Sequence, residues 1–323
     1  MRDRWAMFAT QHRLEIRLLG TFQASVDGRP ACTGGSKRDA LLALLALRRG
    51  RPVSVDALIE ELWDSDLPAS PRNAVQHHVA RLRAVLGPEA IVASRNGYAI
   101  ADATTDALVF EDSLVRARAA LRAGDARSAA ETAAQALSLW RGPALQGMPD
   151  TGWLRAEADR LEGLRVDVLE ERFEAALELG EHREIISDLQ HAVRESPFRE
   201  RLWRQLMVAL YRSGRAADAL ETYQSARRVH VEQLGLDPGP ELRRTQEAIL
   251  AHDPGIAGVS RAPAPRTAPV LPLEDRGDEL ARVLDQLREN LRHAEELYAR
   301  ARSAAEGVVP PAGQAAAMAG LAA

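Results

Sequence analysis

The chain has 323 residues, of which 46% are hydrophobic, 27% charged and 4% aromatic, and its formal net charge is −4. This length predicts about two domains, each large enough to bury a hydrophobic core. The single Cys32 excludes an internal disulfide and a cysteine-based zinc cluster, which fits a reducing compartment. No apolar run reaches the roughly 18–20 residues that span a bilayer, and the first residues lack the apolar stretch of a signal peptide. We therefore expect a soluble, cytoplasmic protein that has no contact with a membrane.

The charge is distributed unevenly along the chain. Residues 1–103 carry 14 basic and 11 acidic side chains, whereas residues 104–323 carry 28 basic and 35 acidic ones. The first part is therefore positive by 3 and the rest negative by 7. A positive block joined to a negative remainder indicates that one part meets a polyanion and the other part meets something else.

The sequence pattern of the N-terminal part predicts a small sheet followed by helices. Residues 14–31 alternate or run apolar, and Asp27-Gly28 among them is a hairpin turn signal. A leucine-rich helix is expected at about 36–49. Ser54 is a good N-cap for a second helix, in which apolar residues recur at helical spacing as far as Trp63.

A third helix and a hairpin complete this part. Ser70-Pro71 combines an N-cap residue with a proline at the first helical position, and Gly87-Pro88 stops the helix after Leu86. Beyond it, IVASR and YAI flank Asn96-Gly97, the best short hairpin signal in the chain. Strands, three helices and a hairpin in this order predict a winged helix-turn-helix with an additional N-terminal sheet.

From Asp106 to Leu250 the pattern is helical almost throughout, with Gly124, Gly180 and Gly214 at the expected turns. A repeat of 34 residues, typical of tetratricopeptide helix pairs, relates the segments around the last two glycines. Residues 107–140 predict another helix pair outside this register. The aligned positions are Leu169, Phe173, Leu177, Gly180, Ile185, Leu189 and Ala192 with Trp203, Met207, Tyr211, Gly214, Ala219, Tyr223 and Ala226.

The predicted fold class is mainly α with a small β component, in two domains. The expected segments are a flexible N-terminus at 1–13, the winged helix-turn-helix at 14–103, an all-α tetratricopeptide-like domain at 104–250, a Pro/Ala-rich linker at 251–272, a helix at 273–306 and a disordered tail at 307–323.

The third predicted helix separates an apolar face from a polar one. On a helical wheel Val75, Val79, Leu82 and Leu86 fall together and are expected in the core. The opposite face and its flanks carry Asn73, Gln76, His77, Ala80, Ala84, Arg72, Arg81 and Arg83.

The polar face of this helix suits the major groove of DNA. Asn and Gln side chains pair with adenine, Arg pairs with guanine, and alanines permit close approach. A polar helix face alone more often points simply into solvent. The absence of acidic residues between Ser70 and Gly87, together with the helix before and the hairpin after, favours DNA binding.

Two further basic sites accompany this helix. Arg95 and Asn96 at the hairpin tip are expected to reach a minor groove or the DNA backbone, although an ordinary exposed turn fits equally well. Lys37 and Arg38 open the first helix, where backbone N–H groups and cations hold phosphates, although exposed charges at a helix start fit as well.

These segments resemble a known family. GSKRDALLALLALRRGRPVSVDALIEELW, the helix SPRNAVQHHVARLRAVLG and the wing NGYAI are similar to the OmpR-like winged helix of the Streptomyces antibiotic regulatory proteins. Residues 137–145, 153–172 and 191–250 are similar to the bacterial transcriptional activator domain that follows it in that family. The resemblance covers about 14–250, with both domains in the family's order.

The resemblance implies a transcriptional activator that binds direct repeats in double-stranded DNA near promoters of secondary-metabolite gene clusters. It also implies contacts with RNA polymerase, including the sigma subunit, and dimerisation on DNA. His77 stands where relatives often have a small polar residue such as Thr, so the base preference there is open. The DNA contacts carried over are Arg72, Asn73, Gln76, His77, Arg81, Arg83 and Arg95.

Other classes remain as alternatives or are disfavoured. The main alternative is a helical-repeat interaction or sensor module that uses its winged helix as a platform for protein. An enzyme is not expected, because no catalytic cluster stands out, and no sequence matches the phosphate-binding loop of an ATPase. We expect no cofactor. A metal is not expected either, since His77 and His78 point about 100° apart on a helix and no Cys or carboxylate accompanies them.

Overall fold

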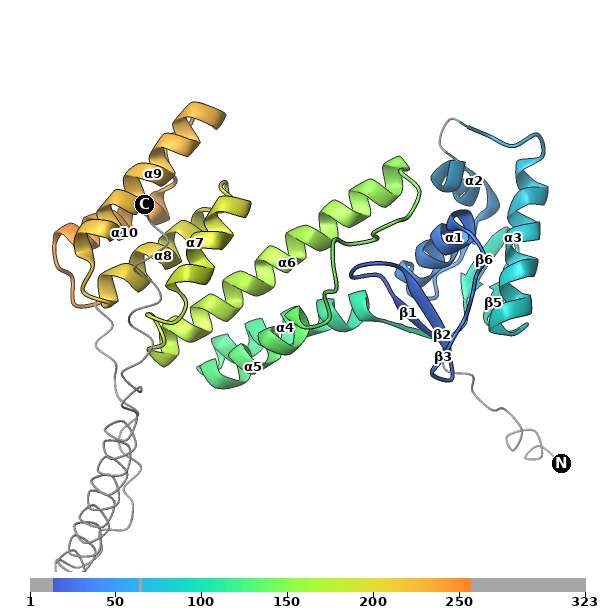
Figure 1. Cartoon of the computed structure of the whole chain (residues 1–323), viewed down its shortest axis with the longest axis horizontal. Coiled ribbons are helices and arrows are strands. Elements are labelled where there is room, and N and C mark those ends of the chain that lie inside the picture. The colour runs from blue at the N-terminus through green and yellow to red at the C-terminus, as the bar shows by residue number, and fades with distance from the viewer. Residues whose placement is uncertain (1–13, 64–65, 257–323) are drawn as a thin grey trace, which may run out of the picture. The chain divides into compact units, whose positions relative to one another are not determined.

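The computed structural model describes residues 14–63 and 66–256, which form seven short strands and ten helices (Figure 1). The predictions for residues 1–13, 273–306 and 307–323, and for most of the linker at 251–272, lie outside the described residues. The strands are β1 Leu14–Arg17, β2 Gln23–Val26, β3 Arg29–Pro30, β4 Val53–Ser54, β5 Ile91–Ala93, β6 Gly97–Ile100 and β7 Ala103–Thr105. The helices are α1 Ser36–Leu47, α2 Val55–Trp63, α3 Pro71–Leu86, α4 Asp106–Arg122, α5 Ala126–Leu137, α6 Gly152–Leu179, α7 Ile186–Glu195, α8 Glu200–Arg212, α9 Ala216–Leu234 and α10 Pro240–Leu250.

The N-terminal sheet has the strand order β3-β2-β1-β7. Asp27 and Gly28 both have a positive φ between β2 and β3, which confirms the hairpin turn there. The strand β7 is absent from the sequence prediction. It pairs in parallel with β1, with Leu14 opposite Ala103, and leads directly into α4.

The three helices α1, α2 and α3 pack together beside a second sheet of order β4-β6-β5, as a winged helix requires. The Ser54 hydroxyl accepts a hydrogen bond of 3.2 Å from the Ala57 backbone N–H and confirms the predicted cap of α2. Leucines of α1 and α2, with the predicted apolar face of α3, form the core: Leu41, Leu42, Leu44, Leu45, Leu58, Leu62, Val75, Val79, Leu82 and Leu86.

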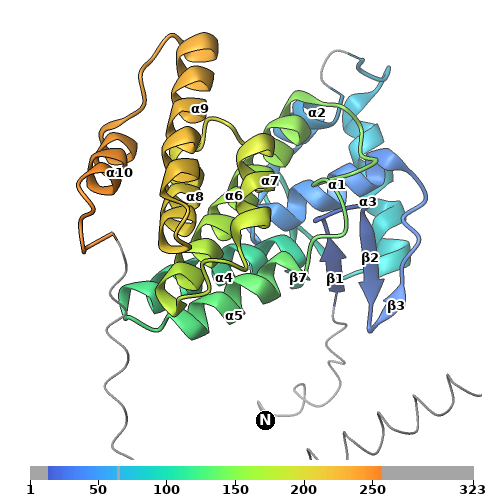
Figure 2. The ribbon, with the colours of Figure 1, turned by 60° about the vertical axis from the view of Figure 1, so that its left-hand side comes forward.

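The helices from α4 to α10 follow one another as antiparallel pairs, and α4 and α5 lie against α6 in both ribbon views (Figures 1 and 2). The predicted repeat is confirmed, because Gly180 and Gly214 end α6 and α8 with the same φ of 80°. The predicted pair at 107–140 is α4 and α5. It falls outside the repeat register because the long connection 138–151 separates it from α6.

Hydrogen bonds to the backbone of Leu18 and Leu19 join the winged helix to the helical domain. The Asp106 carboxylate accepts from the backbone N–H groups of Leu18 at 2.7 Å and Leu19 at 3.2 Å. In the connection 138–151, the N–H groups of Arg141 and Leu145 donate to the carbonyls of Leu19 and Leu18 at 2.9 and 2.8 Å. One continuous hydrophobic cluster runs from β1 to α6, and a second cluster holds the end of α6 and the helices α7 to α10. The described residues lie within one compact unit.

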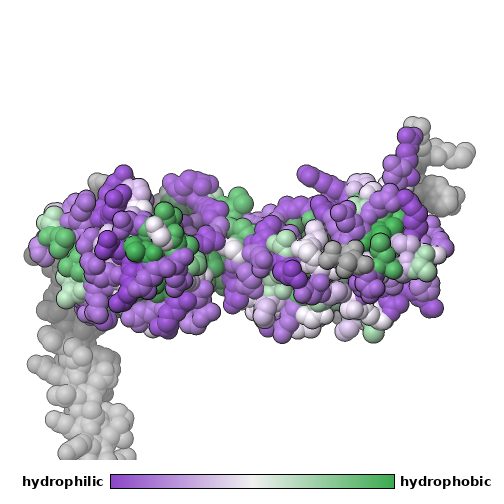
Figure 3. Space-filling view, turned by 90° about the horizontal axis from the view of Figure 1, so that it is seen from above, coloured by the Kyte–Doolittle hydropathy of each residue, from purple (hydrophilic) through white to green (hydrophobic). Residues whose placement is uncertain are grey.

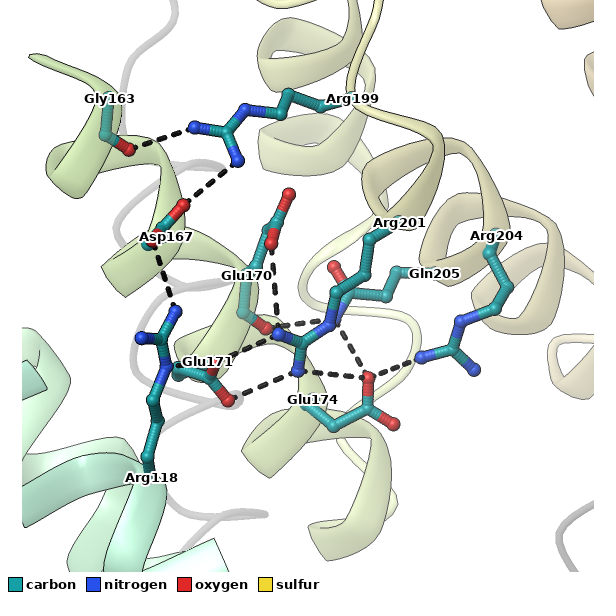
Figure 4. A network of polar contacts seen from close by, with 10 residues as sticks. All are labelled: Arg118, Gly163, Asp167, Glu170, Glu171, Glu174, Arg199, Arg201, Arg204 and Gln205. Carbon is teal, nitrogen blue, oxygen red and sulfur yellow. Dashed lines mark hydrogen bonds and ion pairs between the residues drawn. The ribbon is translucent and has the colours of Figure 1, made fainter. Parts of the chain in front are cut away.

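A polar network joins α4 and α8 to the middle of α6 (Figure 4). Arg118 of α4 donates to Glu171 at 3.0 Å and to Asp167 at 3.1 Å. Arg201 of α8 donates to both oxygens of Glu171 at 2.8 and 3.1 Å, and Arg199 donates to Asp167 at 2.9 Å. Burial alone would raise the pKa of Glu171, but these hydrogen bonds from Arg201 and Arg118 lower it. The helices α4 and α8 are therefore both held to α6 by this network.

No helix within residues 14–63 and 66–256 is both long enough and apolar enough to cross a membrane. Over the same residues, no group of three or more His, Cys, Asp and Glu side chains is placed to hold a metal ion.

Replacing Asp106 tests the junction between the two domains. We expect Asp106→Ala to lower the free energy of unfolding by at least about 2 kcal/mol, because two buried N–H groups lose a charged acceptor. Urea unfolding followed by circular dichroism measures the change. Glu131→Ala, which removes an exposed carboxylate from α5, should change stability by less than about 0.5 kcal/mol. Equal effects of the two substitutions would contradict the assignment.

Candidate nucleic-acid interface

The helix α3 presents the predicted polar face to solvent. Its apolar residues are buried, and Asn73, Gln76, His77 and Arg81 are exposed together with Ala80 and Ala84. No acidic residue lies on α3, so the exposed face combines amide, imidazole and guanidinium groups without a competing carboxylate on the same helix. This face has the chemistry that reads base edges in a major groove.

Arg72 stands at the start of α3 beside the start of α2. Its guanidinium pairs with the Asp56 carboxylate, and both side chains are mostly exposed, at 64% and 74%. An ion pair this exposed contributes little to stability, about 0–1 kcal/mol. Exchanging the Asp56 carboxylate for a phosphate would therefore cost Arg72 little free energy. The sequence pattern does not indicate this partner, because Asp56 lies on another helix.

Arg83 is held inside the winged helix. Its Nε and Nη2 atoms donate to the Ile91 carbonyl oxygen at 2.9 and 2.7 Å, and its guanidinium lies 6.0 Å from the centre of the Tyr98 ring. The side chain is half-buried, whereas the helical wheel places it with the DNA contacts. Arg83 thus ties α3 to both strands of the hairpin and orients the wing.

The wing itself is the hairpin of β5 and β6, and Arg95 and Asn96 are exposed at its tip. The Ser94 N–H donates to the Gly97 carbonyl at 2.9 Å, which makes Arg95-Asn96 the centre of the turn. The hairpin is as predicted, but its turn centre is one residue earlier than the Asn96-Gly97 signal, and neither residue has a positive φ. Gly97 instead meets a close neighbour: a Cβ there would lie 1.8 Å from the Val53 carbonyl oxygen of β4.

Lys37 and Arg38 at the start of α1 are engaged in internal contacts. The Lys37 Nζ donates to the Leu62 carbonyl at 2.5 Å and lies 5.8 Å from the centre of the Trp63 ring. The Arg38 guanidinium donates to the Gly34 carbonyl. Both side chains are only partly exposed: Lys37 is held by the end of α2, and Arg38 by the turn that precedes its own helix.

His78 is half-buried and stacks on Trp63, with ring centres 5.8 Å apart and planes inclined by 25°. Its neighbour His77 is exposed, so adjacent histidines have different environments, as their helical spacing predicts. Burial, and then the nearby charges of Arg38, His77 and Lys37, lower the pKa of His78 below its ordinary value.

Two family models match the chain in succession. The model described as "Transcriptional regulatory protein, C terminal" matches residues 31–100, and the "Bacterial transcriptional activator domain" matches residues 105–250. Together with the exposed face of α3, they define the class as a transcriptional regulator with a winged-helix head and a helical activator domain.

Similar full-length proteins narrow the class to a family. Regulatory protein DnrI of Streptomyces peucetius is 35% identical over 257 residues, which cover 75% of this chain and 94% of DnrI. Transcriptional regulator RedD of Streptomyces coelicolor is 36% identical over 251 residues, covering 75% of this chain and 71% of RedD. The chain belongs to the Streptomyces antibiotic regulatory protein family, a family of transcriptional regulators, as its sequence motifs predict.

Longer relatives and one solved structure share the same region. Regulatory protein AfsR of Streptomyces coelicolor is 39% identical over 254 residues, and the match covers 78% of this chain but 26% of AfsR, so the chain spans about a quarter of that relative. The structure of Mycobacterium tuberculosis EmbR in complex with a low-affinity phosphopeptide matches with a TM-score of 0.73 and 34% identity, covering 76% of this chain and 66% of EmbR.

Gly97 provides a test of how the wing is built. Gly97→Ala should lower stability by about 1–3 kcal/mol, because the new methyl group forces β4 and β6 apart. Thermal unfolding measures this. The control Gly152→Ala adds the same methyl group at the first residue of α6, where a Cβ meets nothing within 4 Å, and should leave the melting temperature unchanged or raise it. Equal melting temperatures of the two variants would contradict the close contact between Gly97 and Val53.

The lowered pKa of His78 predicts that acid weakens the winged helix. The folded state holds the proton on His78 less tightly than the unfolded state, so stability is lost as pH falls below about 6.5. His78→Phe keeps a ring against Trp63 but takes no proton. Its melting temperature should fall less than that of the parent between neutral pH and pH 5. Parallel falls in the two proteins would refute a role for His78.

Proposed function

We propose that the protein is a sequence-specific DNA-binding activator of transcription, which controls a secondary-metabolite gene cluster by binding direct repeats near a promoter. The exposed, acid-free face of α3 carries this proposal, because its side chains are those that recognise base edges. The same face disfavours the alternative of a protein-binding platform, since Val85 is the one large apolar side chain that α3 exposes, and it forms no contiguous apolar patch on that helix.

Each exposed side chain has a proposed role in the complex. Asn73 and Gln76 would read adenine, Arg81 would read guanine, and His77 would contact the base edge beside them. Ala80 and Ala84 allow the helix to approach the bases closely. These contacts determine specificity.

Other residues contribute affinity and orientation. Arg72 would exchange Asp56 for a phosphate, and Arg95 with Asn96 would reach the neighbouring minor groove or backbone. Arg83 would act chiefly by keeping the wing in position, with a backbone contact at the edge of the groove. Lys37 and Arg38 would reach phosphates only after leaving the Leu62 and Gly34 carbonyls.

The proposed partners follow from the charge of each domain. Residues 1–103 are positive by only 3, so non-specific DNA affinity should be weak and binding to repeated sites as a homodimer should be needed. The acidic helical domain would contact RNA polymerase, including the sigma subunit. This role would place the protein in the cytoplasm, at the chromosome, with no catalytic activity of its own.

Arg81→Ala tests base recognition by α3. Specific binding to the operator should weaken by about 1–3 kcal/mol and discrimination at one base pair should relax, while the melting temperature stays unchanged. A gel-shift titration against parent and mutated operators measures both. Arg127→Ala removes an equally exposed arginine from α5 and should leave binding unchanged. Equal operator affinity of Arg81→Ala and the parent would overturn the role of Arg81.

Chromatin immunoprecipitation across the genome of the native host would supply that operator and test the proposed function. We expect enrichment at a small number of promoters that share a direct repeat. Uniform recovery of the genome, or none, would contradict sequence-specific activation.

A further inference from the structure

A cavity of about 550 Å³ opens between the start of α8, the end of α9 and the middle of α6. We call it the α8–α9 pocket, and the residues that matter in its wall are Glu170, Phe198, Glu200, His230, Leu234 and Leu236. It lies on the helical domain, and none of the proposed DNA contacts lines it.

Exposed apolar side chains surround the mouth of this pocket. Phe198, Leu234 and Leu236 are 48%, 46% and 64% exposed, and Val231 is exposed one helical turn before Leu234. Figure 3 shows a mainly hydrophilic face on which hydrophobic residues gather in small patches. A cluster of several large exposed apolar residues around a cavity is typical of a surface that binds a protein partner.

The floor of the pocket contains a buried carboxylate that lacks a full partner. Glu170 is only 6% exposed, and no hydrogen bond to its carboxylate is found among the described residues. Its nearest cation is Arg201 at 3.7 Å, but Arg201 hydrogen-bonds Glu171 at 2.8 and 3.1 Å. In Figure 4 the Glu170 carboxylate lies apart from those of Glu171 and Glu174. Burial raises the pKa of Glu170, against the opposing effect of Arg201 and Arg199.

The other polar groups of the pocket also offer acceptors. The His230 Nδ1 lies 2.9 Å from the Ala226 carbonyl, so Nδ1 carries a hydrogen and Nε2 is an acceptor when the ring is neutral. Nε2 lies 3.7 Å from the Glu200 Oε1 atom, which already accepts the Gly239 N–H at 2.8 Å. The arginine donors in the wall are already committed, because Arg199 donates to Asp167 and to the Gly163 carbonyl at 2.9 and 3.1 Å. The Glu170 carboxylate and the neutral His230 ring therefore offer acceptors in a cavity whose arginine donors are engaged elsewhere.

We propose that the α8–α9 pocket receives an arginine side chain from an amphipathic helix of a partner protein, whose apolar residues cover Phe198, Leu234 and Leu236. A guanidinium supplies several donors in a fixed geometry and pairs well with carboxylates. Its aliphatic stem fits the apolar wall. This inference is independent of DNA binding, which uses α3.

Fluorescence anisotropy with the full chain tests the proposal. The probes are labelled amphipathic helical peptides that are identical except for a central arginine, norleucine or glutamate. The arginine peptide should bind about tenfold more tightly than the norleucine peptide, and the glutamate peptide most weakly. Equal binding of the three peptides, or no binding, would overturn the proposal.

Variants of the chain separate the charged floor from the apolar rim. Glu170→Gln should remove the preference for arginine and leave binding of the norleucine peptide unchanged. Leu236→Ser should weaken both peptides about tenfold, whereas Val115→Ser, at a similarly exposed site on α4, should change neither. An intact arginine preference in Glu170→Gln, or no effect of Leu236→Ser, would refute the pocket. Unchanged operator affinity in all three variants separates this result from a failure of the proposed DNA-binding function.

Discussion

The structure depends on how the two residues that follow β1 satisfy their buried backbone groups. Leu18 and Leu19 are fully buried, and their N–H and carbonyl groups need partners that solvent does not supply. Asp106 at the start of α4 accepts from both N–H groups, and the connection 138–151 donates to both carbonyls. Because these partners belong to the helical domain, the buried backbone that follows β1 is satisfied by the junction between the two domains.

This junction also couples the exposed face of α3 to the larger helical domain. The core that supports α3 continues from β1 into α6, so the exposed face of α3 and the helical domain rest on shared packing. The network around Asp167 and Glu171 then fastens α8 to the same helix. If a partner such as RNA polymerase binds the helical domain, any resulting change in conformation would reach the winged helix through packed side chains and not through a flexible linker.

Much of the fold and part of the site follow from sequence pattern. Apolar spacing places Val75, Val79 and Leu82 in the core, and the paired glycines at 180 and 214 reveal the repeat. Strands β4 and β7 escape prediction because they have only two and three residues and exist through pairing with distant segments. A helical wheel gives the direction of a side chain but not its partner, so it misses that Arg83 holds the Ile91 carbonyl and that Lys37 holds Leu62.

Affinity cleavage by an iron chelate tests most directly that the exposed face of α3 enters DNA. The chelate is attached through Val85→Cys, at the flank of that face, in a Cys32→Ser background, on a promoter fragment recovered with the protein from its host. Cleavage should cluster within each copy of the repeat, on both strands across one groove, and the same chelate on Ala123→Cys at the end of α4 should leave those positions uncut. Equal cleavage from the two sites, or none from Val85→Cys while the complex stays bound, would contradict recognition by α3.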